Sequence, residues 1–400
     1  MKEGWTYKKF TDVVWFQEGP GVRKTQYTDS GVKLLNVANL VDGKIDLTTS
    51  KRYISEEEAY GKYNHFLVDD GDFIIASSGI QVDYFEKKMG FITASQLPLC
   101  MNTSTIRFKA LDKSALNMKF LMYYLKSNHF KNQLSRQITG IAQLNFGPLH
   151  LKRMFVPITD FKEQSHIVSE LDLLSSIIEK KKAQLKEYDQ LSQSIFYDMF
   201  GDPVTNEKGW EVKKIGEIAS VKTGPFGSML HKEDYISDGI PLVNPIHIRD
   251  FHIVADMDFT ITNEKAEELS NYILQKDDVV FARRGDIGRC AVVSDKENGY
   301  LCGTGSLFVR FVVEIVSTYI MYVIRSSSFT KELISNAKGA TMLNLNSSII
   351  ENSRLPLPPL HLQQQFDEKI EAIEKQKELI KQSIAESQTL LDYTMDKYFG

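Results

Sequence analysis

The sequence predicts an α+β protein in which two similar globular domains are joined by two long antiparallel helices, a coiled-coil-like spacer, with an internal pseudo-two-fold repeat. Three observations predict this fold. Similar segments recur in the same order, each copy mixes short β-prone runs with helical runs, and each copy ends in a long stretch without glycine or proline. We expect globular domains at 1–158 and 202–357, a central spacer helix at 159–201 and a C-terminal spacer helix at 358–400.

The repeat is clearest where segments align without gaps. "GIAQLNFGPLHLKRMFVP" at 140–157 pairs with "GATMLNLNSSIIENSRLP" at 339–356, an offset of 199 residues. Upstream, "DGDFIIASSG" at 70–79 pairs with "KDDVVFARRG" at 276–285, an offset of 206 residues. Because the matched pieces keep their order in both halves, one structural plan used twice explains them better than chance does.

The stretches 162–199 and 361–398, which lack glycine and proline, are predicted to be helices. A helix of this length is about 57 Å long at about 1.5 Å per residue. If the globular domains at its two ends bind DNA, they would contact sites more than one turn apart on one duplex. The alternative is two unrelated surface helices. Apolar residues at heptad-like spacing indicate a pairing seam; they are Ile167, Leu171, Leu174, Ile178 and Leu185 in the first helix, and Ile370, Ile373, Ile380 and Ile384 in the second.

One lysine interrupts each seam. Lys181 occupies the position of Ile380 in the other copy, and Lys377 occupies that of Ile178. Neither seam is therefore ideal, so we expect each helix to require one specific partner. The simplest partner is the other copy, packed antiparallel.

The composition, with 42% hydrophobic and 25% charged residues, is typical of a soluble globular chain. No apolar run has membrane-spanning length, no signal peptide is evident, and three widely spaced cysteines fit a reducing cytoplasm. The net charge of −4 is concentrated in the helical segments 161–200 and 361–400, which carry −2 and −3, so the rest of the chain carries +1. Basic patches that bind nucleic acid are therefore not excluded.

The loop "FARRGDIGRC" at 281–290 combines arginines with glycine, as a DNA-reading loop would. Arginine on guanine is the commonest specific base contact, and glycine allows close approach of the backbone. The equivalent loop in the first copy, "ASSGIQVDYFEKK", keeps the glycine but has two serines in place of two arginines. The alternative is a hairpin whose arginines pair with Asp277, Asp278 or Asp286. The candidate DNA-binding residues here are Arg283, Arg284, Gly285 and Arg289 in the second copy, and Ser77, Ser78, Gly79 and Gln81 in the first.

Two further glycine-rich loops, 19–26 and 223–232, follow a first β-prone run in each copy. We expect Lys24 and backbone amides of the first loop to contact a DNA phosphate, and Lys222 and Ser228 at the second to be DNA-binding residues. Asn145 and Asn344 recur after "GIAQL" and "GATML"; each would either bond a base or cap the following helical turn.

No catalytic or metal-binding residues are predicted. The histidines are scattered, and there is no CxxC motif or Cys/His cluster. Methylation of the adenine amino group calls for an (N/D)PP(Y/F) motif, and "VNPIHI" and "GDPVT" both lack its second proline and its aromatic residue.

The duplicated order of a tryptophan start, an (S/R)G loop, G-x-x-x-L-N, a proline-containing entry and a long helix resembles the specificity subunit of type I restriction–modification enzymes. "PLPPLHLQQQF" at 356–366 is very similar to that family's entry to its spacer helix, whereas "VPITDFKEQSHIV" at 156–168 is more divergent. The resemblance covers essentially the whole chain.

The resemblance implies a non-catalytic DNA-recognition subunit whose two domains each read one half of a bipartite, asymmetric target. It implies that the helices set the half-site spacing and dock two copies of a methylation subunit. It also implies that S-adenosylmethionine, ATP and Mg²⁺ are bound by methylation and restriction subunits and not by this chain. Two other readings stay open: a stand-alone DNA methyltransferase or nuclease with unrecognised motifs, and a tandem scaffold that binds only protein.

Exchange of residues 1–158 for another arm of the same family should change only one half of the recognised site, because each copy carries its own loops. Sequencing of methylated sites in cells that carry the chimaera tests this. A change in both halves would contradict two independent reading domains.

Overall fold

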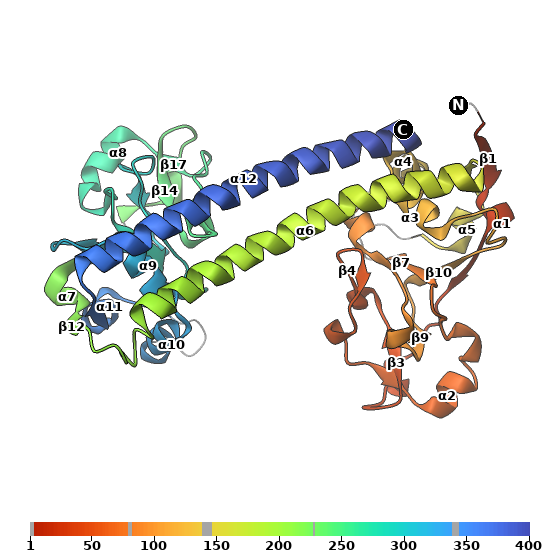
Figure 1. The fold of residues 1–400 in the computed structure, drawn as a ribbon, viewed down its shortest axis with the longest axis horizontal. Helices are drawn as coiled ribbons and strands as arrows, with labels where there is room; N and C mark the ends of the chain where they lie inside the picture. Colours follow the sequence, from red (N-terminus) through yellow and green to blue (C-terminus); the bar gives the residue numbers. More distant parts are fainter. Residues whose placement is uncertain (1–3, 79–81, 138–145, 227–228, 338–343) are drawn as a thin grey trace. The chain divides into compact units, whose positions relative to one another are not determined.

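The structure is a computed structural model that describes residues 4–78, 82–137, 146–226, 229–337 and 344–400. It divides into two compact units, the first made of 1–181 and 383–400 and the second of 182–382. Two 40-residue helices, α6 (Phe161–Phe200) and α12 (Leu360–Phe399), each contribute to both units (Figure 1). None of the helices in these described ranges is long and apolar enough to cross a membrane.

Both units contain the same four-stranded antiparallel sheet. Every strand of the first unit's sheet has a counterpart in the same place in the second, so the sequence repeat is a repeat of topology. The strand order is β2 (Val14–Glu18), β10 (Thr105–Ala110), β7 (Phe73–Ala76), β8 (Met89–Phe91) in unit 1, and β13 (Ala219–Thr223), β21 (Ser306–Phe311), β18 (Val279–Ala282), β19 (Cys290–Val292) in unit 2.

Smaller sheets repeat in the same way. A three-stranded sheet has one antiparallel and one parallel pair in each unit. These sheets are β6 (Tyr53–Ile54), β3 (Val32–Leu35), β9 (Leu99–Met101) and β17 (Thr260–Ile261), β14 (Ile240–Val243), β20 (Leu301–Cys302); the two-stranded ones are β1 (Thr6–Lys9) with β11 (Phe155–Ile158), β12 (Glu211–Lys214) with β22 (Arg354–Leu357), β4 (Leu40–Val41) with β5 (Lys44–Ile45), and β15 (Ile248–Arg249) with β16 (His252–Ile253).

The helices of each unit also correspond. The matched helices are α1 (Phe10–Val13) and α7 (Ile215–Ile218), α2 (Glu56–Tyr60) and α8 (Asn263–Glu268), α3 (Met118–Lys126) and α9 (Ser317–Arg325), α4 (Asn128–Ser135) and α10 (Ser327–Asn336), and α5 (Pro148–Leu151) and α11 (Ser347–Asn352). In each unit two consecutive helices, α3 and α4 or α9 and α10, meet at a serine that caps the second helix. The hydroxyl of Ser127 accepts from the amide of Phe130, and that of Ser326 accepts from the amide of Phe329.

The main core of each unit is completed by one end of each long helix. In unit 1 the buried residues Ile167 and Leu171 of α6 and Phe399 of α12 join the cluster around α3. In unit 2, Phe196 and Phe366 join the cluster around α9. Without either helix end, one side of the core would lose its aromatic and aliphatic packing contacts.

A buried glutamine fixes the start of each long helix. The Oε1 atom of Gln164 accepts from the amide of Asn117 at 2.9 Å, and its Nε2 donates to the carbonyl of Thr159 at 2.8 Å. Gln363 makes the equivalent bonds to Val316 at 3.0 Å and Pro358 at 2.8 Å. Because every polar atom of the amide is used, the helix is tied to the loop that precedes α3 or α9.

The two long helices pair antiparallel within each unit. In unit 1, Nζ of Lys181 donates to the hydroxyls of Ser383 at 2.6 Å and Ser387 at 2.9 Å, and the hydroxyl of Tyr398 donates to Glu170 at 2.6 Å. As α6 advances from 170 to 181, its contacts on α12 therefore run backward from 398 to 383.

In unit 2, Nζ of Lys377 lies 2.8 Å from Asp189 Oδ1 and 2.7 Å from Glu374 Oε1, while Phe200 packs against Phe366. The helices are again antiparallel, and the seam lysine is satisfied by carboxylates where Lys181 uses hydroxyls. Of the predicted seam residues, Ile167, Leu171, Ile178, Ile370 and Ile373 are buried, and Leu174, Leu185, Ile380 and Ile384 are half-buried.

Acid should weaken unit 2 through Glu374. Burial alone would raise the pKa of this carboxyl, but bonds from His252 and Lys377 outweigh burial and lower the pKa from 4.5 to about 2. Its stabilising contribution is therefore complete above about pH 4.5 and is lost as the pH falls toward 2. We expect Glu374→Gln to remove this part of the acid dependence of the thermal unfolding midpoint. Glu378→Gln, at an exposed position of the same helix, is the control and should keep it.

Candidate nucleic-acid interface

Four loops meet at one end of the four-stranded sheet in each unit, and we call them the loop cluster. In unit 2 they are 224–226, 283–285, 303–305 and 344–345, and in unit 1 they are 19–21, 77–78, 102–104 and 146. The same three backbone hydrogen bonds join them in both units. The bonds run from Gly224 to Ser306, Arg283 to Gly305 and Leu345 to Arg283 in unit 2, and from Gly19 to Thr105, Ser77 to Ser104 and Phe146 to Ser77 in unit 1.

The first loop of each cluster approaches the third so closely that only glycine fits. A Cβ on Gly19 would lie 2.0 Å from the carbonyl oxygen of Asn102, and a Cβ on Gly224 would lie 2.0 Å from that of Gly303. The cluster therefore depends on a glycine at this position in both copies.

Of the three arginines predicted to read DNA, only Arg284 presents a free guanidinium. Its side chain is exposed, and no hydrogen bond or ion pair joins it to another residue in the described parts of the chain. The adjacent Gly285 has a φ of 76°, which turns the backbone sharply just after Arg284. Arg284 is thus an unpaired cation on a sharp turn at the end of a sheet, an arrangement suited to contacts with base edges or phosphate.

Arg283 is structural in this conformation. Its side chain is only 9% exposed, and its Nε donates to Oδ1 of Asn344 at 3.1 Å. Burial and the neighbouring Arg284 lower the pKa of its guanidinium. Asn344 therefore holds Arg283, and the turn that follows is capped by Asn346, whose Oδ1 accepts from the amide of Ile349 at 2.9 Å. The capping role considered for Asn344 is wrong for this reason.

Arg289 pairs with a nearby aspartate, as the alternative of a structural hairpin predicts. Its Nε and Nη2 donate to the same Oδ2 atom of Asp286 at 3.2 Å and 3.0 Å, and its Nη1 donates to the carbonyl of Pro245 at 3.1 Å. Asp278 instead pairs with Arg310, at 2.6 Å, inside the sheet.

The unit 1 cluster has hydroxyls where unit 2 has arginines. Ser77 is buried, and its Oγ has no hydrogen-bond partner among the described residues. Ser78 donates to the hydroxyl of Ser104 at 2.5 Å. Lys24 is exposed, and in unit 2 Lys222 donates to the carbonyl of Asn271 at 3.4 Å. The predicted site residues Gly79, Gln81, Asn145 and Ser228 lie outside the described residues.

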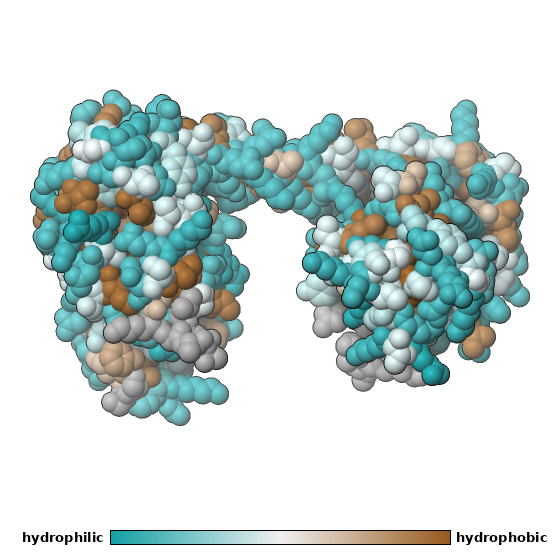
Figure 2. Space-filling view, turned by 90° about the horizontal axis from the view of Figure 1, so that it is seen from below, coloured by the Kyte–Doolittle hydropathy of each residue, from teal (hydrophilic) through white to brown (hydrophobic). Residues whose placement is uncertain are grey.

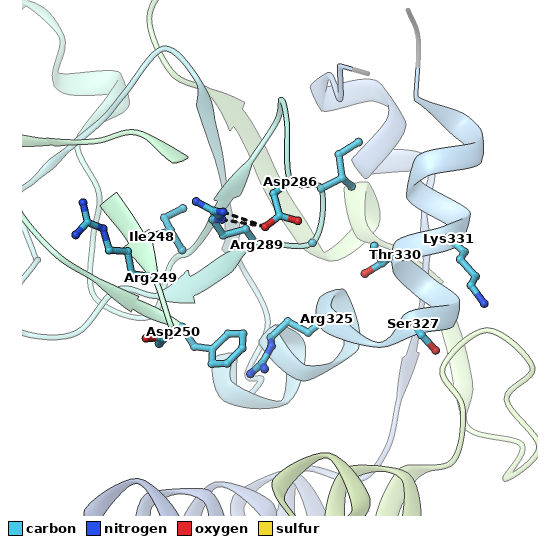
Figure 3. Close-up of a pocket in the computed structure, with 12 residues that line it drawn as sticks. Ile248, Arg249, Asp250, Asp286, Arg289, Arg325, Ser327, Thr330 and Lys331 are labelled. Atoms are coloured by element: carbon cyan, nitrogen blue, oxygen red, sulfur yellow. Dashed lines mark hydrogen bonds and ion pairs between the residues drawn. The ribbon is translucent and has the colours of Figure 1, made fainter. Parts of the chain in front are cut away.

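A cavity of about 810 Å³ adjoins the unit 2 cluster, and the sequence analysis did not find it. Residues 286–289 form one wall, and the end of α9 and the start of α10 form another (Figure 3). Three of its cations, Arg249, Arg325 and Lys331, were not among the predicted residues. The signal that could have found them is the repeat itself, because Lys126 occupies the position of Arg325 in the first copy.

The face visible in Figure 2 is mostly hydrophilic, with hydrophobic side chains in small separate patches. Within the described ranges, no group of three or more His, Cys, Asp and Glu side chains is placed to hold a metal ion.

A duplicated α+β domain whose loop clusters depend on glycine, with a free arginine in the second copy, fits a tandem DNA-recognition protein. The family model "Type I restriction modification DNA specificity domain" matches residues 2–187 and 207–387, so the chain belongs to this family and contains two copies of the domain. Members of the family are non-catalytic specificity subunits of type I restriction–modification systems, which work with methylation and restriction subunits on DNA.

Known specificity subunits resemble the chain over most of its length or over about half of it. It is 22% identical to the type I restriction enzyme MjaIX specificity subunit of Methanocaldococcus jannaschii, over 92% of this chain and 86% of that protein. It is 22% identical to the EcoAI specificity subunit of Escherichia coli over 46% of this chain and 31% of that protein.

Solved structures share the fold. The specificity subunit of a type I system from M. genitalium aligns over 99% of this chain and 96% of its own, with a TM-score of 0.53 and 16% identity. A chain from a study of the assembly and conformational transition of a type I system aligns over 100% and 98%, with a TM-score of 0.61 and 17% identity. The predicted fold class is confirmed.

Gly19→Ala should lower the stability of unit 1 by about 1–3 kcal/mol, because the new methyl group would collide with the carbonyl of Asn102. Gly21→Ala is the matched control two residues later, where a Cβ would meet no atom within 4 Å. The thermal unfolding midpoints of the two variants test this. Equal midpoints would show that the close approach is not required.

Proposed function

We propose that residues 1–158 and 202–357 act as two target-recognition domains that each read one half of a bipartite, asymmetric DNA sequence. In this proposal the spacer helices at 159–201 and 358–400 set the distance between the half-sites and dock two copies of the methylation subunit. S-adenosylmethionine, ATP and Mg²⁺ are bound by the partner subunits. The complex works in the cytoplasm, where it meets DNA.

One observation carries the proposal: the two loop clusters share their backbone hydrogen bonds and differ in their side chains. Where unit 2 has Arg283 and Arg284, unit 1 has Ser77 and Ser78. Two domains that recognise different half-sites need the same backbone arrangement and different side chains. Contacts to bases specify the sequence, and the shared backbone positions the side chains that make these contacts.

The two rival functions make different demands. A stand-alone methyltransferase would transfer a labelled methyl group from S-adenosylmethionine to DNA without partners, so the purified chain alone should show none. A scaffold that binds only protein would leave the DNA affinity and the sequence preference of its complex unchanged when Arg284 is replaced by alanine. Phosphate contacts release counterions, so we expect that affinity to fall steeply as salt rises.

Arg284→Ala should relax base preference at one position of one half-site, with a loss of discrimination of about 1–3 kcal/mol if the guanidinium forks onto a guanine. The complex with its methylation subunits is assayed on a library of duplexes, and the methylated sequences are read.

Arg354→Ala removes an exposed arginine from β22 of the same unit and is the control, which should keep the wild-type preference. An unchanged preference in Arg284→Ala would refute base reading by this loop.

A further inference from the structure

The cavity beside the unit 2 loop cluster is strongly cationic. Four cations and two carboxylates line it, which gives the lining a net charge of +2. One carboxylate, Asp286, is already paired with Arg289, so Arg325 and Lys331 remain without an ion pair among the described residues. Figure 3 shows Arg325, Asp286 and Arg289 around the same hollow.

Arg325 is held in this cavity by aromatic rings, and among the described residues no carboxylate lies within ion-pair distance of it, although Asp189 attracts it from farther away. The guanidinium carbon of Arg325 lies over the centre of the Phe251 ring and 5.1 Å from the centroid of the Tyr322 ring. Burial lowers the pKa of Arg325, which means that its charge is poorly solvated where it sits. A desolvated cation on an aromatic face is a strong site for an anion that enters the cavity.

Phe251 adopts a strained backbone to reach that position. It follows Asp250 in the turn between β15 and β16, and its φ is 68°, a conformation that bulky residues rarely adopt. The equivalent turn of unit 1 has Asp42 and Gly43, with φ values of 47° and 77°, so glycine fills the same place there without strain. Strain that one copy avoids and the other keeps points to a function of the Phe251 ring.

Unit 1 provides a natural comparison. A cavity at the corresponding end of α3 and start of α4 contains Lys126, which lies 5.6 Å from the ring centroid of Tyr123 as Arg325 lies over Tyr322, but residues of α6 and α12 complete its lining. Three cations and three carboxylates line that cavity, so its net charge is zero. Two of these carboxylates, Asp392 and Asp396, come from α12, so the corresponding cation of the first copy lies in a neutral cavity and that of the second in a cationic one.

The ligand class follows from the wall that the cavity shares with the loop cluster. Residues 286–289 line the cavity, and Arg284 lies only two residues before them. Three residues span at most about 10 Å, and the turn at Gly285 shortens this, so Arg284 and the cavity lie within the width of about 12 Å of the major groove of DNA. A strand whose bases face Arg284 thus has backbone phosphates within reach of the cavity.

We propose that this cavity is a phosphate-binding site for the DNA backbone, in which Arg325, oriented by Phe251, contacts a phosphodiester next to the half-site that unit 2 reads. This inference rests on the proposed function and deepens it. The site supplies affinity and fixes the position of the duplex, and it carries no base preference of its own.

The first test compares Arg325→Gln, Arg325→Lys and Lys126→Gln in the complex with the methylation subunits, on a mixed-sequence duplex at a series of salt concentrations. Arg325→Gln should bind roughly tenfold more weakly at low salt, and the slope of log affinity against log salt should fall by about one. Arg325→Lys should keep the slope, because the charge remains. Lys126→Gln, in the neutral cavity, should behave as the wild type.

The second test locates the phosphate. Duplexes that contain the methylated target carry one neutral methylphosphonate linkage at a time. Wild type should lose affinity at one linkage beside the unit 2 half-site, and Arg325→Gln should be insensitive to the same linkage. The methylated sequence itself should be unchanged in Arg325→Gln, in contrast to Arg284→Ala.

Phe251→Gly separates binding from folding. This variant copies the unit 1 turn and relieves the backbone strain, which offsets the loss of the ring's packing on the unit 2 core, so its thermal unfolding midpoint should stay close to that of the wild type. Its DNA affinity should nevertheless fall, since the ring that orients Arg325 is gone.

Three results would overturn the inference: wild-type affinity and salt slope in Arg325→Gln, equal losses in Arg325→Gln and Lys126→Gln, or loss of the methylation subunit without loss of DNA affinity. The last would make the cavity a protein-docking site. Failure of the proposed function would look different, because the wild-type complex would itself show no sequence preference.

Discussion

The cores of both units depend on two helix ends that come from distant parts of the sequence. Ile167 and Phe399 complete the core around α3, and Phe196 and Phe366 complete the core around α9. Neither globular domain can bury its main helix unless α6 and α12 are paired beside it. Helix pairing and burial of each main core are therefore coupled, because the same residues serve both.

The polar contacts of the helix pair decide how it can form. Lys181 is satisfied by the hydroxyls of Ser383 and Ser387, and Lys377 by Asp189 and Glu374. A sliding of one helix by a turn would leave a half-buried or buried ammonium group without these acceptors, which is costly. The interruptions in the seam thus fix the register, in the way that a single polar residue does in a coiled coil.

The sequence was sufficient for the duplicated fold, because that depends on patterns within each segment. Glycine-free stretches predicted the long helices, and the aligned loops predicted that both copies use the same frame. The partners of individual arginines could not be predicted. Arg283 meets Asn344, and Arg325 meets Phe251, through contacts between segments far apart in the chain. Such contacts depend on turn geometry and side-chain packing, which local patterns do not contain.

The contribution of α12 to unit 1 has a consequence for biosynthesis. Tyr398 and Phe399 belong to the core that surrounds α3, although the rest of that core lies almost entirely within the first 171 residues. While the ribosome makes the intervening chain, the hydrophobic residues that Tyr398 and Phe399 will cover stay exposed in the N-terminal domain. The nascent chain must either remain partly folded or be shielded by a chaperone until residue 399 has emerged, so maturation of the first domain follows translation of the second.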